Sequence, residues 1–335
     1  MKIWLGIVML AMAVANVSAQ ARPTYFQFTT DDFWLNLHHY LYVLGRARNG
    51  VPDAKEPAVA SAPDDEKQGL ARLTDEEQRA WSSAVDTYAK GLSQQTSMFQ
   101  NPLARLTISL AKTGDVPAFP ATAWQQNDRA TLEAAAPIYR KGWWTRHRTM
   151  NEAYIADLQR TIERDGPAIA AFLSRAYGLE WPERPYPTHV VAYAIWQGAF
   201  SYTGRLMILS SNPYPENQKW YPMESVFHES MHQWDDRVVV LLRTQAEARG
   251  VIVPPDLSHA LVFYTVGEAV RRLHPEHVPM LDALDVWPKN LSGARVPVKR
   301  LQPALQSIWK PYLDGRGTRD EAFGAMVAAA AAATP

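Results

Sequence analysis

The sequence predicts an α+β fold that is mainly helical, and three observations support this. Apolar residues recur at helical spacing through most of the chain before residue 180. Three short segments after that point are rich in β-branched and aromatic residues and predict strands, over 188–196, 199–203 and 205–210. Two amphipathic helices are then predicted, over about 223–250 and over 257–273. We therefore expect a large helical N-terminal half followed by a small sheet and further helices.

The N-terminal half is predicted to contain only helices and loops. A helix from Phe33 to Arg46 carries His38 and His39, which as neighbours on a regular helix cannot point at the same place. Either one of the two lines an active cleft or the histidines are satisfied within packing. Residues 51–67 are rich in Pro, Ala, Ser, Asp and Glu and predict a loop. Further helices are predicted over 74–91, 101–112, 128–163 with an interruption near Pro137 or Gly142, and 167–177.

Two tetrapeptides have the spacing of a helix capping box, in which a Thr and a Glu three residues later exchange hydrogen bonds with each other's backbone. They are Thr74 to Glu77 and Thr318 to Glu321. The first predicts the start of a helix that ends near Gly91. The second predicts a last helix that continues into the alanine-rich end of the chain.

The first residues have the pattern of a secretory signal peptide. Lys2 is followed by an apolar run from Ile3 to Val14, and small residues precede the bond between Ala19 and Gln20. Residues 1–19 are therefore expected to be removed, which gives a secreted or periplasmic mature protein. No later stretch reaches about 18 uninterrupted apolar residues, so no membrane span is expected.

Composition narrows the function classes. The chain has 335 residues, no cysteine, and 34 basic against 34 acidic residues without a long run of one sign. Disulfides therefore cannot stabilise it, and a nucleic-acid partner is not expected. About 315 mature residues are enough to bury a core without such cross-links. The oligomeric state is not indicated.

The pattern most informative about chemistry is His228-Glu229 followed by His232, an H-E-x-x-H motif. Two histidines four residues apart share one face of a helix and can bind a zinc ion, with the glutamate beside them as a base. On a helical wheel the motif shares its face with other polar residues, and the opposite face is apolar. This predicts one zinc ion per chain on a helix with an apolar back.

A catalytic zinc usually takes a third protein ligand. Glu268 is the first choice, because it lies on the polar face of the next helix directly after Gly267, where close helix packing is possible. The alternative for Glu268 is an ion pair with Arg271 or Arg272. His259 is the main rival as the ligand, although it faces away from Glu268 on the apolar side of that helix.

These residues resemble the gluzincin group of zinc metallopeptidases, over about residues 210–273. The resemblance implies zinc on His228, His232 and Glu268, with Glu229 as the general base. It also implies a zincin-like catalytic region over 181–335 with a helical C-terminal tail, after a helical region over 20–180 that it does not explain. Such enzymes often carry an acidic residue four positions after the glutamate ligand, where this chain has Arg272. Asp235 or Asp236 would then support a metal-bound histidine.

The implied activity is hydrolysis of a peptide bond in a peptide or protein substrate by a zinc-activated water, with Glu229 accepting and returning the proton. Tyr264, His259 and His39 are the candidates for a donor to the oxyanion. An edge strand of the small sheet before the motif is expected to pair with an extended substrate backbone, as it commonly does in zinc peptidases. Two alternatives remain open: a secreted binding or scaffold protein without turnover, and a zinc amidase acting on a non-protein amide.

Overall fold

The fold was examined in a computed structural model of the chain. It describes residues 24–30, 32–50, 64–95, 99, 102–119, 126–194, 198–202, 206–212, 219–289 and 297–333. The predicted signal peptide and most of the predicted loop over 51–67 lie outside the described residues.

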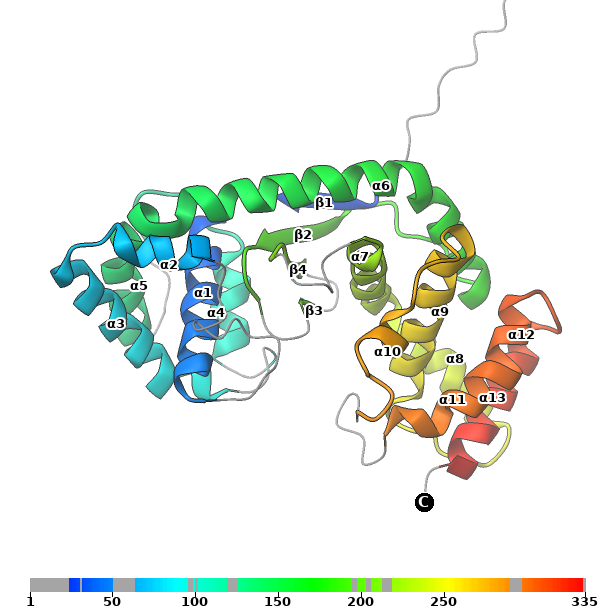
Figure 1. The fold of residues 1–335 in the computed structure, drawn as a ribbon. Coiled ribbons are helices and arrows are strands. Elements are labelled where there is room, and N and C mark those ends of the chain that lie inside the picture. Colours follow the sequence, from blue (N-terminus) through cyan, green and yellow to red (C-terminus); the bar gives the residue numbers. More distant parts are fainter. Residues whose placement is uncertain are drawn as a thin grey trace, which may run out of the picture.

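Helices dominate the first half, as predicted. Five of them form a lobe on one side of the molecule (Figure 1). Their bounds are α1 Phe33–Arg48, α2 Asp64–Ala71, α3 Asp75–Lys90, α4 Leu103–Leu110 and α5 Gln126–Tyr139. α2 begins at Asp64, so the last four residues of the predicted loop are helical. The helix α6, Thr145–Tyr177, leads from this lobe along the length of the molecule.

Pro137 and Pro167 do not end helices here. Pro137 lies inside α5, and Pro167 lies inside α6, which is 33 residues long. A π-helical segment, Arg140–Trp144, joins the two helices and includes Gly142. The predicted interruption near Gly142 is therefore a π-bulge, which keeps the chain helical while shifting its faces.

The sheet has four strands in the order β1-β2-β4-β3. β2 Tyr186–Val191, β3 Ala199–Tyr202 and β4 Leu206–Ser210 correspond to the three predicted strands. β1, Phe26–Thr29, was not predicted, and it pairs with β2 in parallel. β2 and β4 are also parallel, whereas β3 pairs with β4 antiparallel and forms an edge of the sheet.

The remaining helices form a second lobe on the other side of the sheet (Figure 1). The two predicted amphipathic helices are present, although the first is divided in two. The bounds are α7 Tyr221–Met231, α8 Asp235–Glu247, α9 Leu257–Leu273, α10 Met280–Ala283, α11 Gln302–Ala304, α12 Lys310–Leu313 and α13 Arg319–Ala333. Both capping boxes form, with Thr74 N donating to Glu77 over 2.7 Å and Thr318 N to Glu321 over 2.8 Å.

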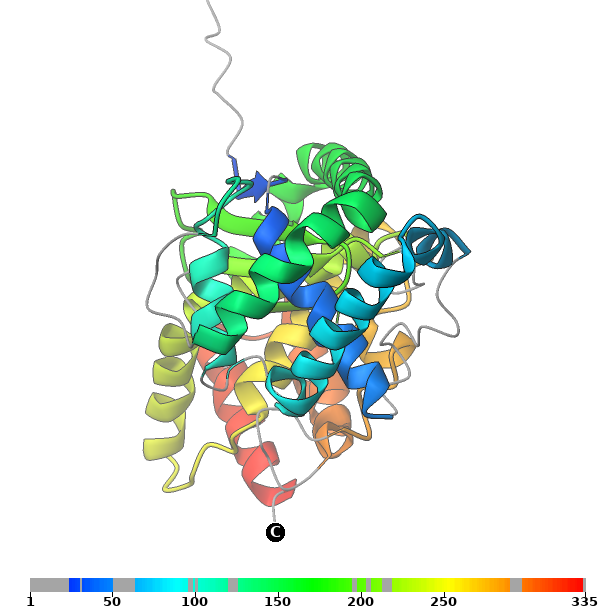
Figure 2. The same ribbon diagram turned by 90° about the vertical axis from the view of Figure 1, so that its left-hand side faces the viewer.

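The described residues form two hydrophobic cores, and the sheet lies between them. Phe200 and Tyr202 of β3 belong to the core of the first lobe, and Ala199 of the same strand belongs to the core around α7 and α9. This alternation follows from the period of two along a strand. Seen from the side of the first lobe, its helices cover the sheet (Figure 2). The sheet is thus the wall on which both lobes pack.

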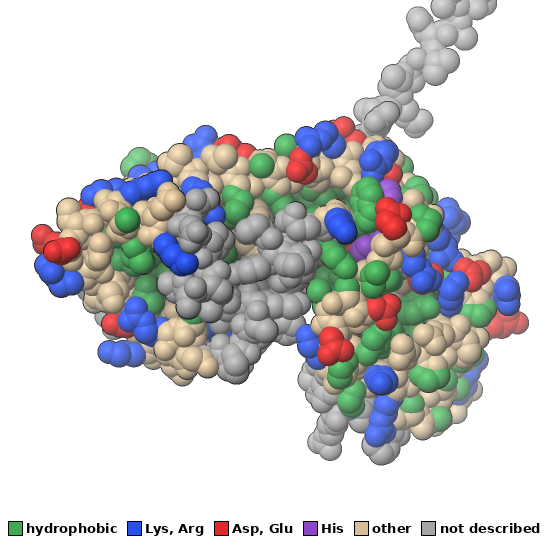
Figure 3. Space-filling model, viewed as in Figure 1, with side chains coloured by type: hydrophobic (Ala, Val, Ile, Leu, Met, Phe, Trp, Pro, Cys, Tyr) green, Lys and Arg blue, Asp and Glu red, His purple; other side chains and the backbone are tan. Residues whose placement is uncertain are grey.

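The described surface is mixed in charge. On the face drawn in Figure 3, basic and acidic side chains are interspersed over both lobes. Within the described ranges, no helix combines the length and apolar character that crossing a bilayer requires.

Candidate metal centre

The H-E-x-x-H motif lies at the end of α7. The helix ends at Met231, and a 3-10 segment from His232 to Trp234 leads directly into α8. His232 keeps helical backbone angles, φ −61° and ψ −15°. His228 and His232 therefore still share one face, as the four-residue spacing predicts.

Three histidines meet at this place. His228, His232 and His259 each offer one ring nitrogen, and these atoms lie within 4.8 Å of one another. The Nε2 atoms of His228 and His259 are 3.2 Å apart. Such a group of nitrogen atoms could hold a metal ion.

α7 and α9 run antiparallel, and this arrangement brings His259 to the motif. Residues spaced four apart lie on one face of each helix. On α7 these residues are taken toward its N-terminus, and each one faces a residue four positions further toward the C-terminus of α9. The ring of His232 lies 5.1 Å from that of His259, and the ring of His228 lies 3.9 Å from that of Phe263. One turn further, a Cβ on Gly267 would lie 3.0 Å from the carboxylate of Glu224. We call these three facing pairs the α7–α9 ladder.

The histidine ring nitrogens differ in their partners. Nδ1 of His232 lies 3.0 Å from Asp235 Oδ2, so of the two carboxylates considered for this position, Asp235 is the one that contacts a motif histidine. This contact leaves Nε2 of His232 for the cluster. Nδ1 of His228 is buried and has no hydrogen-bond partner among the described residues.

Burial and neighbouring charges set the protonation of the cluster. Burial and, to a lesser extent, the charges of the adjacent histidines lower the pKa of His228 well below its usual range and that of His259 to about 3. Burial also acts to lower the pKa of His232, but the hydrogen bond of Asp235 and the charge of Glu229 outweigh it and the pKa is raised. At neutral pH His228 and His259 are thus neutral, the form that binds metals.

Glu229 lies between the two motif histidines in sequence and is buried, with 7% of its surface exposed. Burial raises the pKa of its carboxyl, while the charge of His232 and a hydrogen bond of the Ser201 side chain act in the opposite direction. Ser201 belongs to β3, one of the two edge strands of the described sheet. A glutamate with a raised pKa beside a metal-binding group is suited to carry a proton. The role of Ser201 was not predicted, because nothing in the sequence pairs it with Glu229.

Glu268, the predicted third ligand, is not part of the group of three histidines that the structure brings together. Its carboxylate forms ion pairs with Arg271 and Arg272, the latter at 3.1 Å, and it lies 3.9 Å from Lys310 Nζ. Glu268 is also about two and a half helical turns, or about 13 Å, from His259 along α9. The third group beside the motif is therefore the rival, His259, and Glu268 has the alternative role of an ion-pair partner. The apolar side of α9 is the side that packs on α7.

The other predicted residues, Tyr264, His38 and His39, are not part of the three-histidine group. Tyr264 is near Glu268, and burial together with the Glu268 charge raises its pKa to about 12. His38 and His39 are fully buried in the first lobe, where His38 Nδ1 contacts the Tyr88 hydroxyl at 3.0 Å. His39 is one of the predicted oxyanion donors. Its ring lies 5.8 Å from that of Phe200, whose side chain faces the first lobe, so His39 lies on the first-lobe side of β3.

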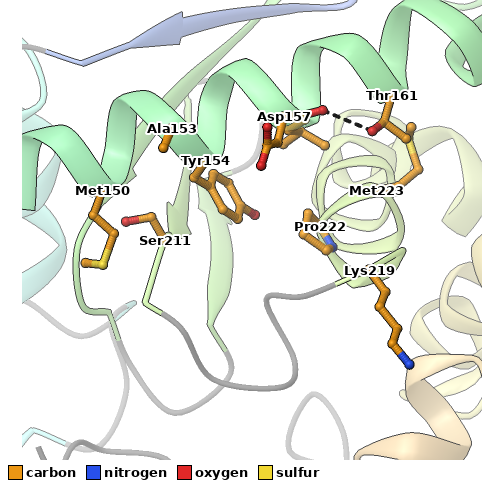
Figure 4. Close-up of a pocket in the computed structure, with 10 residues that line it drawn as sticks. Met150, Ala153, Tyr154, Asp157, Thr161, Ser211, Lys219, Pro222 and Met223 are labelled. Carbon is orange, nitrogen blue, oxygen red and sulfur yellow. Dashed lines mark hydrogen bonds between the residues drawn. The ribbon is translucent and has the colours of Figure 1, made fainter. Parts of the chain in front are cut away.

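A cavity of about 300 Å³ lies at the opposite end of α7, between α6 and the end of β4. Tyr154 of α6, Ser211 after β4 and Met223 of α7 contribute to its lining (Figure 4). None of the three histidines lines this cavity. It is therefore separate from the cluster.

The three histidines could hold zinc or another metal ion that imidazole binds. Three histidines form one of the known catalytic zinc sets, and two nitrogens at zinc bond lengths in a tetrahedron are separated by about 3.3 Å. The 3.2 Å between His228 and His259 Nε2 matches that separation. A carboxylate on the far nitrogen of one ligand, as Asp235 provides for His232, is a usual feature of such sites.

Comparison of the chain with models of protein families, with curated proteins and with solved structures finds no match in any of the three.

Proposed function

We propose that this protein is a zinc-dependent metallopeptidase in which His228, His232 and His259 hold the metal and Glu229 is the general base. The main support is the meeting of three histidine nitrogens within 4.8 Å of one another beside a buried glutamate. Relative to the gluzincin pattern, the third ligand is a histidine in place of a glutamate.

A zinc ion in this site would supply a Lewis acid that polarises a substrate carbonyl and makes water more acidic. The chain's own residues supply the proton transfer and the orientation. Glu229 accepts a proton from the attacking water and donates it to the leaving nitrogen, which its raised pKa favours. Asp235 orients the His232 ring through Nδ1.

A peptide is the favoured substrate because of the position of β3. This strand forms an edge of the sheet, and its Ser201 side chain bonds to Glu229. All four residues of β3 are buried, so an extended peptide would add to this edge through backbone hydrogen bonds only after the part of the chain that covers it moves. The peptide would then lie beside the general base. The proposed enzyme acts outside the cytoplasm, after removal of residues 1–19.

Substitution of Glu229 by Gln tests the hydrolytic role directly. The variant should keep its zinc, since Glu229 is not a ligand, and should lose hydrolysis by a factor of at least 10² because an amide cannot accept the proton. Digestion of a diverse peptide library, read by mass spectrometry together with metal content, measures both effects.

Two results would contradict this proposal. A Glu229→Gln variant that cleaves like the wild type would exclude Glu229 as the base. A zinc-loaded wild type that cleaves no peptide would favour one of the alternatives, a binding protein or an amidase for a non-protein amide.

A further inference from the structure

Glu224 is a buried carboxylate on α7, one turn before His228 and on the same face. It has only 1% of its surface exposed, and its Oε2 lies 2.6 Å from His277 Nε2. Both of its oxygens accept the backbone N–H of Met280 at 3.0 Å. The carboxylate is therefore fixed by the segment that connects α9 with α10.

This segment belongs to the same structural unit as His259. His277 and Met280 follow the end of α9, and His259 lies at the beginning of that helix. The ring of Tyr221, at the start of α7, lies 5.2 Å from the ring of His277 and is a second contact between α7 and this segment. Glu224 thus connects the helix that carries two of the histidines to the unit that carries the third.

Gly267 shows how close the helices are at this point. A Cβ on Gly267 would lie 3.0 Å from Glu224 Oε1 and 2.7 Å from Pro279 Cβ, so any larger residue would force α7 and the α9–α10 connection apart. Gly267 and Glu224 form one end of the α7–α9 ladder, and His232 and His259 form the other. Because helices are stiff over two turns, separation at one end changes the spacing at the other.

We infer that Glu224 is a positioning residue for the metal centre. It fixes the distance and the register between α7 and α9, the two helices that carry the three histidines. Burial raises the pKa of Glu224, and its hydrogen bond to His277 acts against that shift. The carboxylate is therefore retained at an energetic cost that a purely apolar contact would avoid. This inference uses the proposed metal site but does not depend on hydrolysis.

Zinc affinity, measured by competition with a chromophoric chelator, is the direct test. Glu224→Ala should weaken zinc binding by about tenfold or more, a typical loss for residues that orient metal ligands. Glu224→Gln should lose less, because the amide oxygen still accepts the Met280 N–H. Gly267→Ala should also weaken zinc binding, because the added methyl group perturbs the same contact from the opposite helix.

Asp165→Asn is the matched control. Asp165 on α6 lies 2.8 Å from Nε2 of His274, the residue that follows α9, so this hydrogen bond holds the same end of α9 to α6. The His274 ring also stacks on Trp220, the residue that precedes α7, and Asp165→Asn leaves that stacked pair of rings in place. The control should lower the melting temperature and leave zinc affinity within about threefold of the wild type. The visible spectrum of the cobalt-substituted proteins should change for the Glu224 and Gly267 variants alone.

The outcomes distinguish this inference from the proposed activity. If Glu224→Ala does not fold, Glu224→Gln and Gly267→Ala still decide the matter. Wild-type zinc affinity in both of these folded variants would overturn the inference, as would an equal loss in Asp165→Asn. A wild type that binds zinc and cleaves no peptide, with the variants weakened as expected, would support the inference while contradicting the peptidase activity.

Discussion

The Nε2 atoms of His228 and His259 lie 3.2 Å apart, although 31 positions separate the two residues in the chain. Two neutral imidazoles at this distance either share one proton in a hydrogen bond or direct two lone pairs at the same point. The second arrangement is the one a metal ion requires.

The third ligand can be identified by metal content. The wild type should bind close to one zinc per chain, and His232→Ala and His259→Ala should each lose most of it, because two remaining histidines hold zinc weakly. Elemental analysis of the purified proteins measures this. Full zinc content in His259→Ala would exclude His259 as a ligand and favour Glu268 as the third ligand.

Glu268→Gln should instead affect stability. The carboxylate is 4% exposed and pairs with Arg271 and Arg272, so its loss should lower the free energy of unfolding by about 1–3 kcal/mol. Zinc content should stay at the wild-type level. Urea denaturation and elemental analysis of the same preparation separate the two effects. Loss of zinc without loss of stability would contradict the ion-pair role.

The buried histidines of the first lobe should make the protein acid-sensitive. Burial lowers the pKa of His39 to about 3 and that of His38 well below its usual range, where the charge of His39 also contributes. Their unfolded pKa is about 6.5, so below that pH the unfolded state binds protons that the folded state does not. The stabilising contribution is complete above about pH 6.5. It decreases toward pH 3 by about 1.4 kcal/mol per pH unit for each histidine.

His39→Leu isolates one of these contributions. Between about pH 6 and pH 4 the free energy of unfolding of this variant should depend less steeply on pH than that of the wild type, by about 1.4 kcal/mol per pH unit. Urea denaturation at a series of pH values provides the measurement. Parallel curves for the two proteins would show that His39 does not titrate on unfolding.

The exported protein should begin near Gln20. Small residues precede the bond after Ala19, and a short apolar run precedes them. N-terminal sequencing of protein recovered from outside the cytoplasm tests this. Protein that is exported with Lys2 still attached would refute the cleavage.

Local sequence determined most of the elements around the metal centre. The H-E-x-x-H motif, the bounds of α9 and the strands β3 and β4 follow from residue spacing and composition. Both capping boxes were predicted for the same reason, since their hydrogen bonds join residues three positions apart. β1 was missed, because four residues with two aromatics have too little pattern to predict a strand that forms only by pairing with β2.

Tertiary structure decided which residue lies beside the two motif histidines. The helical period of α9 placed His259 and Glu268 on different sides, but it could not show which side packs on α7 or in which direction the helices run. The antiparallel α7–α9 ladder brings His259 to His232 and leaves Glu268 among Arg271, Arg272 and Lys310, the last from a separate helix. Helical periodicity defines the faces of one helix, whereas a ligand set depends on the register between two.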